Sequence, residues 1–353
     1  TPLIFIDMPG DTENTVLLYG HLDKQPEMMG WNEGFGPWKP VLKENKLYGR
    51  GGADDGYALF ASLLAIKILH KQKIPHARCV VIIEACEESG SYDLPFYIDH
   101  LKDRLGKPEL VICLDSGCGN YEQLWSTTSL RGLVGGELKV EVLDEGIHSG
   151  DISGIIPSSF RILRQLLDRI EDPVSGQILL KECYVDIPNK RIEQAKHAAS
   201  VLNENVFRRF PIKGNIRPVS DDLVELILNR SWRPTLSYLG ASGLPEINDA
   251  GNVLRPFTAL KLSFRLPPDV DCHVAMESVN KILTENPPYN ATISINWEEP
   301  ANGWNAPKLS SWLDHAIQEA SKTFYGKPAL AMGEGGTIPF MAMLGEKFPK
   351  AQF

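Results

Sequence analysis

A histidine and several carboxylates follow the ends of three short apolar segments in the first third of the sequence. The junctions are residues 15–19 followed by His21, residues 79–83 followed by Glu87 and Glu88, and residues 110–114 followed by Asp115. Adjacent carboxylates at the end of a buried strand repel each other unless a cation or a shared proton compensates them. Imidazole nitrogen and carboxylate oxygen together suit zinc, manganese or cobalt. These residue types could therefore support metal-assisted hydrolysis, in which the metal activates a water molecule and polarises a carbonyl group.

Each of these features has a simpler structural explanation when it is taken alone. His21 and Asp23 could belong to a surface turn, although a carboxylate two residues away can also fix the tautomer of a metal-bound histidine. Asp54 and Asp55 could cap the helix that follows them. The paired glutamates could be a solvated charge pair. Taken together at one edge of a sheet, with no Lys or Arg at the strand tips, these residues favour a metal site.

The elements that would position these residues are predicted to form an open α/β sheet. Near-continuous apolar runs that alternate with helical stretches are typical of parallel strands buried on both faces. Residues 57–69, rich in Ala and Leu, predict a buried crossover helix between the first two strands. Because ligands in such sheets bind beyond the carboxyl ends of the strands, the three junctions should converge on one edge.

After Gly132 the sequence changes to strands that alternate polar and apolar residues. The expected strands are residues 137–143, 260–266 and 292–297, and the expected helices are residues 158–170 and 273–283. Two βαβ-like halves indicate a ferredoxin-like α+β domain with one sheet face open to solvent. We therefore predict a catalytic domain in residues 1–132 and 301–353, interrupted by an inserted domain in residues 133–300.

Composition narrows the class of protein. The 353 residues are 43% hydrophobic and 23% charged, which is typical of a globular chain of about two domains. A net charge of −9 (36 − 45) argues against nucleic-acid and anionic-membrane binding. No apolar run is long enough to span a bilayer, and no signal-peptide pattern is present. Six scattered cysteines without a CxxC pair predict reduced thiols in the cytoplasm.

Six motifs in order resemble those of the two-metal aminoacylase and carboxypeptidase superfamily, which includes carnosinase-type dipeptidases and succinyl-diaminopimelate desuccinylases. They are His21-Leu-Asp23, the LYGRGGADDG of residues 47–56, the EACEESGS of residues 84–91, Asp115, His148-Ser-Gly150 and the EGGTIP of residues 334–339. The resemblance implies a zinc-exopeptidase-like catalytic domain with a mostly parallel sheet. It also implies that the inserted ferredoxin-like domain is a lid through which the chain forms a homodimer.

The resemblance assigns a ligand set for two divalent metal ions. It implies that His21 and Asp115 bind one ion, that Asp54 bridges the two, and that Glu88 binds the second. The expected ions are zinc, with manganese or cobalt as alternatives. A final histidine ligand should follow the glycine-rich loop, but none occurs there, so we expect a truncated chain whose last ligand lies beyond Phe353.

Two further carboxylates have catalytic roles by the same resemblance. Asp23 would orient His21, and Glu87 would be the general base that deprotonates the attacking water and later protonates the leaving amine. The peptide bond between Asp54 and Asp55 is expected to be cis. The resemblance is not complete, because Gly56 stands where a lysine often follows the paired aspartates and Gly333 replaces a basic residue.

Arg265 is a candidate for substrate binding. It shares the polar face of its predicted strand with Lys261 and Ser263, where it is either a solvated charge or a bidentate clamp for a substrate carboxylate. By the resemblance, Glu334 and Thr337 would line the same pocket.

His148 and Asn252 are expected to act across a dimer. The resemblance implies that His148 reaches the active site of the partner subunit and stabilises the oxyanion of the tetrahedral intermediate, and that Asn252 joins it. Taken alone, His148 could be a loop histidine in a turn rich in Gly and Ser.

These residues predict a metal-dependent exopeptidase that hydrolyses dipeptides or short peptides with a free carboxylate. The long lid favours the carnosinase-type dipeptidases. Hydrolysis of N-succinyl-diaminopimelate, or of another N-acyl amino acid, is the main alternative, because the bond, metals and base would be the same. A degenerate homologue that only binds is an alternative of another class, motivated by the departure at Gly56 and the missing histidine.

Overall fold

The computed structural model describes residues 1–353, and the contacts among them define two compact units. The first unit comprises Thr1–Cys118, Ala306–Gly326 and Pro339–Phe353, and the second comprises Gly119–Asn305 and Lys327–Ile338. The two units alternate along the chain, since each is assembled from separate segments. The domain boundaries expected at residues 132/133 and 300/301 stay a prediction.

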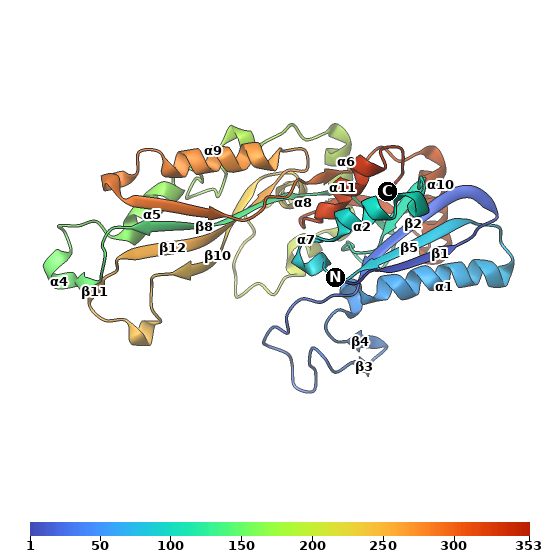
Figure 1. The fold of residues 1–353 in the computed structure, drawn as a ribbon, viewed down its shortest axis with the longest axis horizontal. Helices are drawn as coiled ribbons and strands as arrows, with labels where there is room; N and C mark the ends of the chain where they lie inside the picture. The colour runs from blue at the N-terminus through green and yellow to red at the C-terminus, as the bar shows by residue number, and fades with distance from the viewer. The chain divides into compact units, whose positions relative to one another are not determined.

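The first unit is built on a four-stranded sheet in the order β1-β5-β2-β6. β2 (Thr12–His21) pairs in parallel with both β5 (Ala77–Glu84) and β6 (Leu110–Cys113). β1 (Ile4–Met8) pairs antiparallel with β5 at one edge. The helix α1 (Tyr57–Gln72) connects β2 to β5, as Figure 1 shows. The three expected strands are thus present, and their carboxyl ends lie at the same edge of the sheet.

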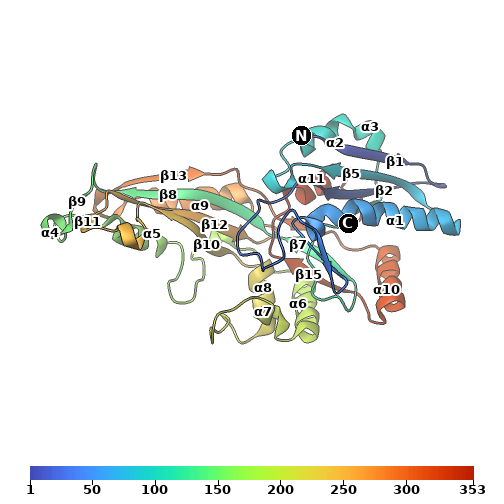
Figure 2. The same cartoon turned by 90° about the horizontal axis from the view of Figure 1, so that it is seen from below.

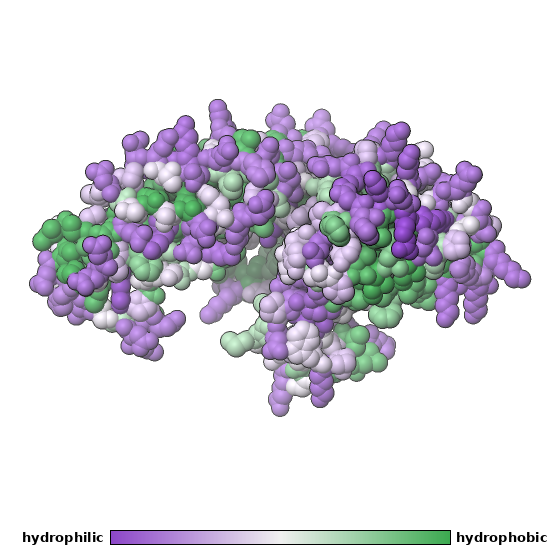
Figure 3. Space-filling model, viewed as in Figure 1, coloured by the Kyte–Doolittle hydropathy of each residue, from purple (hydrophilic) through white to green (hydrophobic).

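The helix α1 buries only one face. Ala58 and Ile66 are 0% and 3% exposed, whereas Phe60, Leu64 and Ile68 on the other face are 70%, 56% and 44% exposed. The prediction of a fully buried helix is therefore wrong for half of its surface, because within the described chain nothing covers that side. Figure 3 shows hydrophobic residues gathered in patches on a face that is otherwise largely hydrophilic.

Smaller elements complete the first unit. They are the hairpin β3 (Val41–Lys43) and β4 (Lys46–Tyr48), the single turns η1 (Gly52–Gly56) and η2 (Glu87–Ser89), and the helices α2 (Leu94–His100), α3 (Lys102–Leu105), α10 (Ser311–Tyr325) and α11 (Pro339–Lys347). Every helix of the structure is too short or too polar to cross a lipid bilayer.

The second unit contains a fully antiparallel sheet in the order β10-β12-β8-β13 (Figure 2). Its strands are β8 (Gly132–Glu141), β10 (Thr235–Ser242), β12 (Phe257–Leu266) and β13 (Thr292–Trp297). In chain order these are the first, second, third and fourth strands, so the spatial order is 2-3-1-4, which is typical of a split βαβ arrangement. The sequence did not predict β10, because most of its residues are exposed at the sheet edge and lack an apolar alternation.

One face of this sheet is packed and the other is open, as expected from the alternation. Leu138, Leu262 and Phe264 are fully buried against the helices α5 (Ser159–Leu167) and α9 (Cys272–Thr284). Each of these strands places alternate residues on opposite faces, which is why its sequence alternates.

A second, three-stranded sheet of this unit lies in the order β14-β7-β15. Its strands are β7 (Trp125–Leu130), β14 (Trp304–Asn305) and β15 (Leu330–Glu334). The helices α6 (Asn189–Leu202) and α8 (Leu223–Ser231) pack with Trp232 and Met332 in a separate apolar core. The sequence did not predict these helices, since α6 has a polar surface and contributes mainly small alanines to the core.

The remaining elements of the second unit are short. They are the paired strands β9 (Ile147–His148) and β11 (Val253–Leu254), the helices α4 (Ser149–Ile152) and α7 (Asn205–Arg208), and the turns η3 (Lys181–Cys183), η4 (Ile247–Asp249) and η5 (Pro288–Asn290).

Leu138→Ala is expected to lower the free energy of unfolding of the second unit by about 3 kcal/mol, because it opens a cavity in a close-packed core. Urea unfolding followed by circular dichroism measures the change. Leu239→Ala is the matched control on the same sheet, because Leu239 is 62% exposed and its truncation should change stability by less than about 0.5 kcal/mol. Equal losses in the two variants would contradict this account of the core.

Candidate metal centre

His21 ends β2 with a buried imidazole that faces carboxylates on both sides. Its Nδ1 lies 3.4 Å from Oδ1 of Asp23, and its Nε2 lies 3.3 Å from Oδ1 of Asp54 and 3.7 Å from Oδ2 of Asp115. The residue is 1% exposed, and Nε2 forms no hydrogen bond. A buried ring nitrogen without a partner costs free energy unless something binds it, so Nε2 is placed as a metal ligand would be.

Asp23 connects His21 to the paired glutamates. Its Oδ1 accepts a hydrogen bond from the backbone N–H of Glu87 (3.2 Å), and its Oδ2 accepts one from the backbone N–H of Glu88 (2.9 Å). The same carboxylate faces the Nδ1 edge of His21. The backbone carbonyl of Asp23 lies 3.2 Å from Nδ1 of His21 as its hydrogen-bond partner, so Asp23 as a whole fixes the imidazole and the turn η2 relative to each other, as groups that orient metal ligands do.

The turn η1 presents the two aspartates differently. The side chain of Asp54 is 59% exposed, whereas Asp55 is fully buried and accepts a hydrogen bond from the backbone N–H of His21 (3.3 Å). The peptide bond between them is cis, as expected. Asp54 is thus free to bind an ion, while Asp55 holds the turn against the end of β2.

Glu87, Glu88 and Asp115 complete the cluster. Oε2 of Glu87 lies 3.9 Å from His21 Nε2, and Oε2 of Glu88 accepts a hydrogen bond of 2.5 Å from Gln25. The ends of β5 and β6 bring these carboxylates to the end of β2, because the three strands are parallel and adjacent.

Burial and mutual repulsion govern the protonation of the cluster. Burial, reinforced by the charge of Asp115, raises the pKa of Asp55 to about 7 and that of Glu87 to about 8. Burial also raises the pKa of Asp115 to about 6. Burial opposes protonation of His21, but the surrounding carboxylates outweigh it and raise the pKa of the imidazole. None of these carboxylates forms an ion pair with a lysine or arginine, so the cluster lacks a positive partner.

The residues fit a site for divalent metal ions. The ligand atoms of His21, Asp54 and Glu88 lie within 4.8 Å of one another, and so do those of His21, Glu87 and Asp115. The donor set is one imidazole and several carboxylates, which zinc, manganese and cobalt accept. Both glutamates reach His21, so the separate roles predicted for Glu87 and Glu88 stay predictions.

Lys24 and Glu84 were not singled out by the sequence. The Lys24 side chain passes over Gly51, and its buried Nζ, which has no partner, lies 3.5 Å from where a Cβ of Gly56 would stand. An ammonium thus lies beside the position where the resemblance led us to expect a lysine. Glu84 is 2% exposed and accepts hydrogen bonds from three side chains, those of Tyr19, Cys86 and Ser91.

All five predicted substrate residues belong to the second unit, and three of them lie in or beside its glycine-rich loop. Nη1 of Arg265 donates a hydrogen bond of 2.8 Å to Oγ1 of Thr337, and Glu334 lies 3.4 Å from Nη2 of Arg230. The glycine-rich loop after β15 therefore brings Thr337 to the strand that carries Arg265.

Arg131 belongs to the same group, although the sequence did not single it out. It is 8% exposed and donates to the carbonyl of Gly335 (3.2 Å) and to Oγ1 of Thr235 (2.9 Å). Burial, with the charges of Arg265 and Arg230 nearby, lowers the pKa of Arg131 to about 10. The sequence does not indicate a role for a single arginine between two strands, because its hydrogen-bond partners are distant along the chain.

His148 and Asn252 are brought together at an exposed hairpin of the second unit. His148 lies opposite Val253 in the pair β9 and β11, and the carbonyl of Asn252 accepts a hydrogen bond from the backbone N–H of Ser149 (2.8 Å). The His148 side chain is 65% exposed. The roles of His148, Asn252, Arg265, Glu334 and Thr337 in substrate binding stay predictions.

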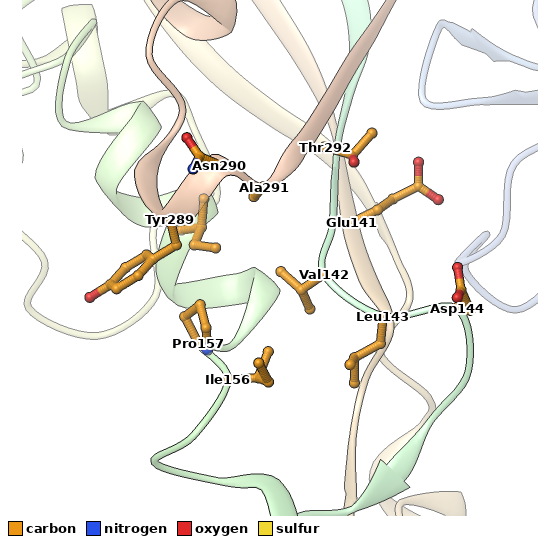
Figure 4. A pocket seen from close by; sticks show the side chains of 11 residues that line it. Glu141, Val142, Leu143, Asp144, Ile156, Pro157, Tyr289, Asn290, Ala291 and Thr292 are labelled. Atoms are coloured by element: carbon orange, nitrogen blue, oxygen red, sulfur yellow. The ribbon is translucent and has the colours of Figure 1, made fainter.

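A hollow of about 660 Å³ lies at the end of the antiparallel sheet in the second unit. Figure 4 shows Val142, Ile156 and Pro157 among the side chains that line it, with Glu141 and Asp144 also labelled. None of the predicted site residues lines this hollow. Its mixed lining does not converge on a reactive group, so we do not assign it to the chemistry.

Residues 17–353 match "Peptidase family M20/M25/M40". The human Beta-Ala-His dipeptidase is 27% identical over 98% of this chain and 69% of its own length. The Cysteinylglycine-S-conjugate dipeptidase of Corynebacterium striatum is 24% identical over 99% of this chain and 75% of its own length.

The fold is also similar to solved structures of peptidases. The crystal structure of human carnosine dipeptidase 1 has a TM-score of 0.77 at 25% identity and covers 99% of this chain and 75% of its own. An M20 family metallo-carboxypeptidase from Sulfolobus solfataricus has a TM-score of 0.79 at 20% identity, with coverage of 99% and 78%. The architecture of mixed α/β sheets is shared with these structures.

Metal-free protein is expected to lose thermal stability as the pH rises from about 6 to 8. The folded-state pKa values of Asp55, Glu87 and Asp115 are raised above their ordinary values of 3.8, 4.5 and 3.8. Stability from the protonated carboxyls is therefore complete below those ordinary values and is lost as the pH rises through about 6, 7 and 8. Zinc or manganese should consequently raise the melting temperature more at pH 8 than at pH 6.

Scanning calorimetry of chelator-treated protein, with and without added metal, measures both effects. Asp314→Asn is the control, because Asp314 is an exposed carboxylate on α10 and its removal should leave the pH dependence unchanged. A metal-induced shift that is the same at the two pH values in the wild-type protein would contradict the electrostatic account.

Proposed function

Because the chain belongs to peptidase family M20/M25/M40, we propose that it is a metal-dependent exopeptidase that hydrolyses dipeptides or short peptides with a free carboxylate. One observation carries the proposal, the buried His21 Nε2 that has no hydrogen bond and faces Asp54, Glu87 and Asp115. The names of similar proteins support the substrate class, since they include Beta-Ala-His and Cys-Gly dipeptidases.

Two divalent ions, zinc in the first instance and manganese or cobalt as alternatives, would be held by the cluster. His21 and Asp115 would hold one ion, Glu88 would hold the other, and Asp54 would contact both. The two groups of ligand atoms within 4.8 Å support a metal site that includes Asp54, Glu88 and Asp115 around His21, and the division between two ions follows the resemblance. When bound, such ions lower the pKa of a water and polarise a carbonyl.

The protein side chains would handle the proton. Glu87 would accept the proton of the attacking water and pass it to the leaving amine. Burial, aided by the charge of Asp115, raises its pKa to about 8, which favours a carboxyl group that exchanges protons near neutrality. Asp23 would hold the His21 ring and the backbone of Glu87 in register through Oδ1, and the backbone of Glu88 through Oδ2.

The second unit would supply substrate recognition. Arg265 and Thr337, which are hydrogen-bonded to each other, would bind the free carboxylate of the substrate, with Glu334 at the pocket edge. The strand order of the antiparallel sheet supports a ferredoxin-like lid inserted in the catalytic domain. His148 and Asn252, paired on an exposed hairpin, would serve the partner subunit of a homodimer formed through this lid.

The cellular location is proposed from the cysteines. All six are unpaired, and Cys79, Cys86, Cys183 and Cys272 are buried, which suits the reducing conditions of the cytoplasm. The substrates would be small molecules, dipeptides or N-acyl amino acids, rather than nucleic acid or membrane.

Turnover should separate the candidate reactions. The full chain loaded with zinc or manganese is expected to hydrolyse dipeptides at a rate that a chelator abolishes, while N-succinyl-diaminopimelate is turned over at least about tenfold less efficiently. Amine release measured for both substrates checks this. Activity on the succinylated substrate alone would establish the desuccinylase instead, and metal binding without either activity would establish a homologue that only binds.

Glu87→Gln and Glu88→Gln should fail in different ways. Glu87→Gln should reduce kcat at least about a hundredfold, since general-base catalysis is lost, while metal content measured by elemental analysis stays near that of the wild-type protein. Glu88→Gln should release metal. Glu277→Gln, on the surface of α9, is the control that should change neither quantity. A Glu87→Gln variant with near-normal turnover would mean that another group is the base.

A further inference from the structure

Three arginines surround the glycine-rich loop of the second unit and share a single carboxylate. Arg230 pairs with Glu334 at 3.4 Å, whereas Arg131 and Arg265 form no ion pair with any carboxylate. Three guanidinium groups and one carboxylate leave two positive charges without a protein partner. The free protein must bear the repulsion among these guanidinium groups, since the single carboxylate of Glu334 does not compensate all three.

Arg131 is the most enclosed of the three and is bonded to the loop at two successive residues. Its backbone N–H donates to the carbonyl of Gly336 (3.0 Å), and its Nε donates to the carbonyl of Gly335 (3.2 Å). A Cβ on Gly335 would lie only 3.2 Å from Nη2 of Arg131, so the glycine lets the loop lie directly against the guanidinium. Arg131 therefore sets where the next residue, Thr337, stands.

The same guanidinium also holds the strand opposite Arg265. Nη1 of Arg131 donates to Oγ1 of Thr235, and Thr235 is the cross-strand partner of Arg265 in the pairing of β10 with β12. Arg265 in turn donates to Thr337. The planar fork of an arginine can hold two acceptors at a fixed separation, which the single ammonium of a lysine cannot. Loop and strand are thus tied together through one buried cation.

We propose that Arg131 is a positioning residue that sets Thr337 against Arg265, and that its unpaired charge adds to the preference of these groups for a carboxylate over a neutral amide. The proposal rests on the proposed function for the identity of the substrate, but not for the existence of an anion site. A neutral amide at the same place would leave both guanidinium groups uncompensated, at the cost that buried charges carry.

Kinetics with an acid and its amide test the selectivity. Wild-type protein loaded with metal should show a KM for Ala-Leu-amide at least about tenfold above that for Ala-Leu, as expected from the loss of a charge-assisted hydrogen bond. Arg131→Gln should raise the KM for Ala-Leu by about tenfold, with kcat and the KM for the amide within about threefold of wild type. Arg131→Lys should restore part of the difference, because it keeps the charge.

Arg169→Gln is the matched control in the same unit. Arg169 donates to backbone carbonyls, those of Ile282, Glu285 and Asn286, and its removal should leave the ratio of the two KM values unchanged. If Arg131 were only structural, Arg131→Gln would lower thermal stability and kcat while the acid-to-amide ratio stayed that of wild type. That result would overturn the proposal, as would a wild-type protein that does not discriminate acid from amide.

Binding to metal-free protein keeps the test independent of activity. Calorimetric titration should show that leucine binds at least about tenfold more tightly than leucinamide, and that Arg131→Gln abolishes the difference. If no dipeptide is hydrolysed but this binding pattern holds, the proposed function fails and the anion site stands. If Arg131→Gln does not fold, the Arg131→Lys variant replaces it in the test. An unchanged preference for leucine over leucinamide in Arg131→Lys would overturn the proposal. Equal binding of leucine and leucinamide to the wild-type protein would overturn it as well.

Discussion

The repulsion among carboxylates at one edge of the first unit's sheet is the constraint on which the site depends. Asp54, Glu87, Glu88 and Asp115 are brought to the end of β2 by adjacent parallel strands, and no lysine or arginine pairs with them. They surround the unpartnered Nε2 of His21, and Glu88 also accepts a hydrogen bond from the Gln25 side chain. The mutual repulsion of these carboxylates destabilises the cluster by itself, and bound divalent cations would stabilise it, so the folded protein is expected to bind metal.

Rigid backbone elements hold this repulsive arrangement in place. Asp23 accepts hydrogen bonds from two successive backbone N–H groups of η2 and faces the His21 ring, while Asp55 is bonded to the backbone of His21 itself. The second unit holds positive rather than negative groups close together. There, Arg131 and Arg265 are fixed by carbonyl and hydroxyl oxygens and left without a counter-ion. The chain thus gathers carboxylates without a cationic partner in one unit and guanidinium groups without a counter-ion in the other.

The acidic cluster could be predicted from sequence because its information is local. His21, Glu87, Glu88 and Asp115 stand at or just beyond the end of an apolar strand, whereas Asp54 stands just before the helix α1. The parallel pairing of the strands is implied by the same apolar runs. Lys24 and Arg131 could not be found in this way. The partners of the Arg131 side chain, Asn229, Thr235 and Gly335, lie 98 to 204 residues away along the chain. The place of Lys24 depends on missing side chains at two glycines. Strand β10 was also not predicted, because a strand at an exposed sheet edge has little apolar pattern in its sequence.

The alternation of the two units along the chain has a consequence for how the protein is made. The chain passes from one unit to the other after Cys118, Asn305, Gly326 and Ile338. The second unit needs the segment ending at Ile338, and the first needs the one after it, so neither is complete until this late stretch has left the ribosome. During synthesis, apolar strand edges must wait for partners encoded hundreds of residues later, a situation in which folding is slow and helper proteins are useful.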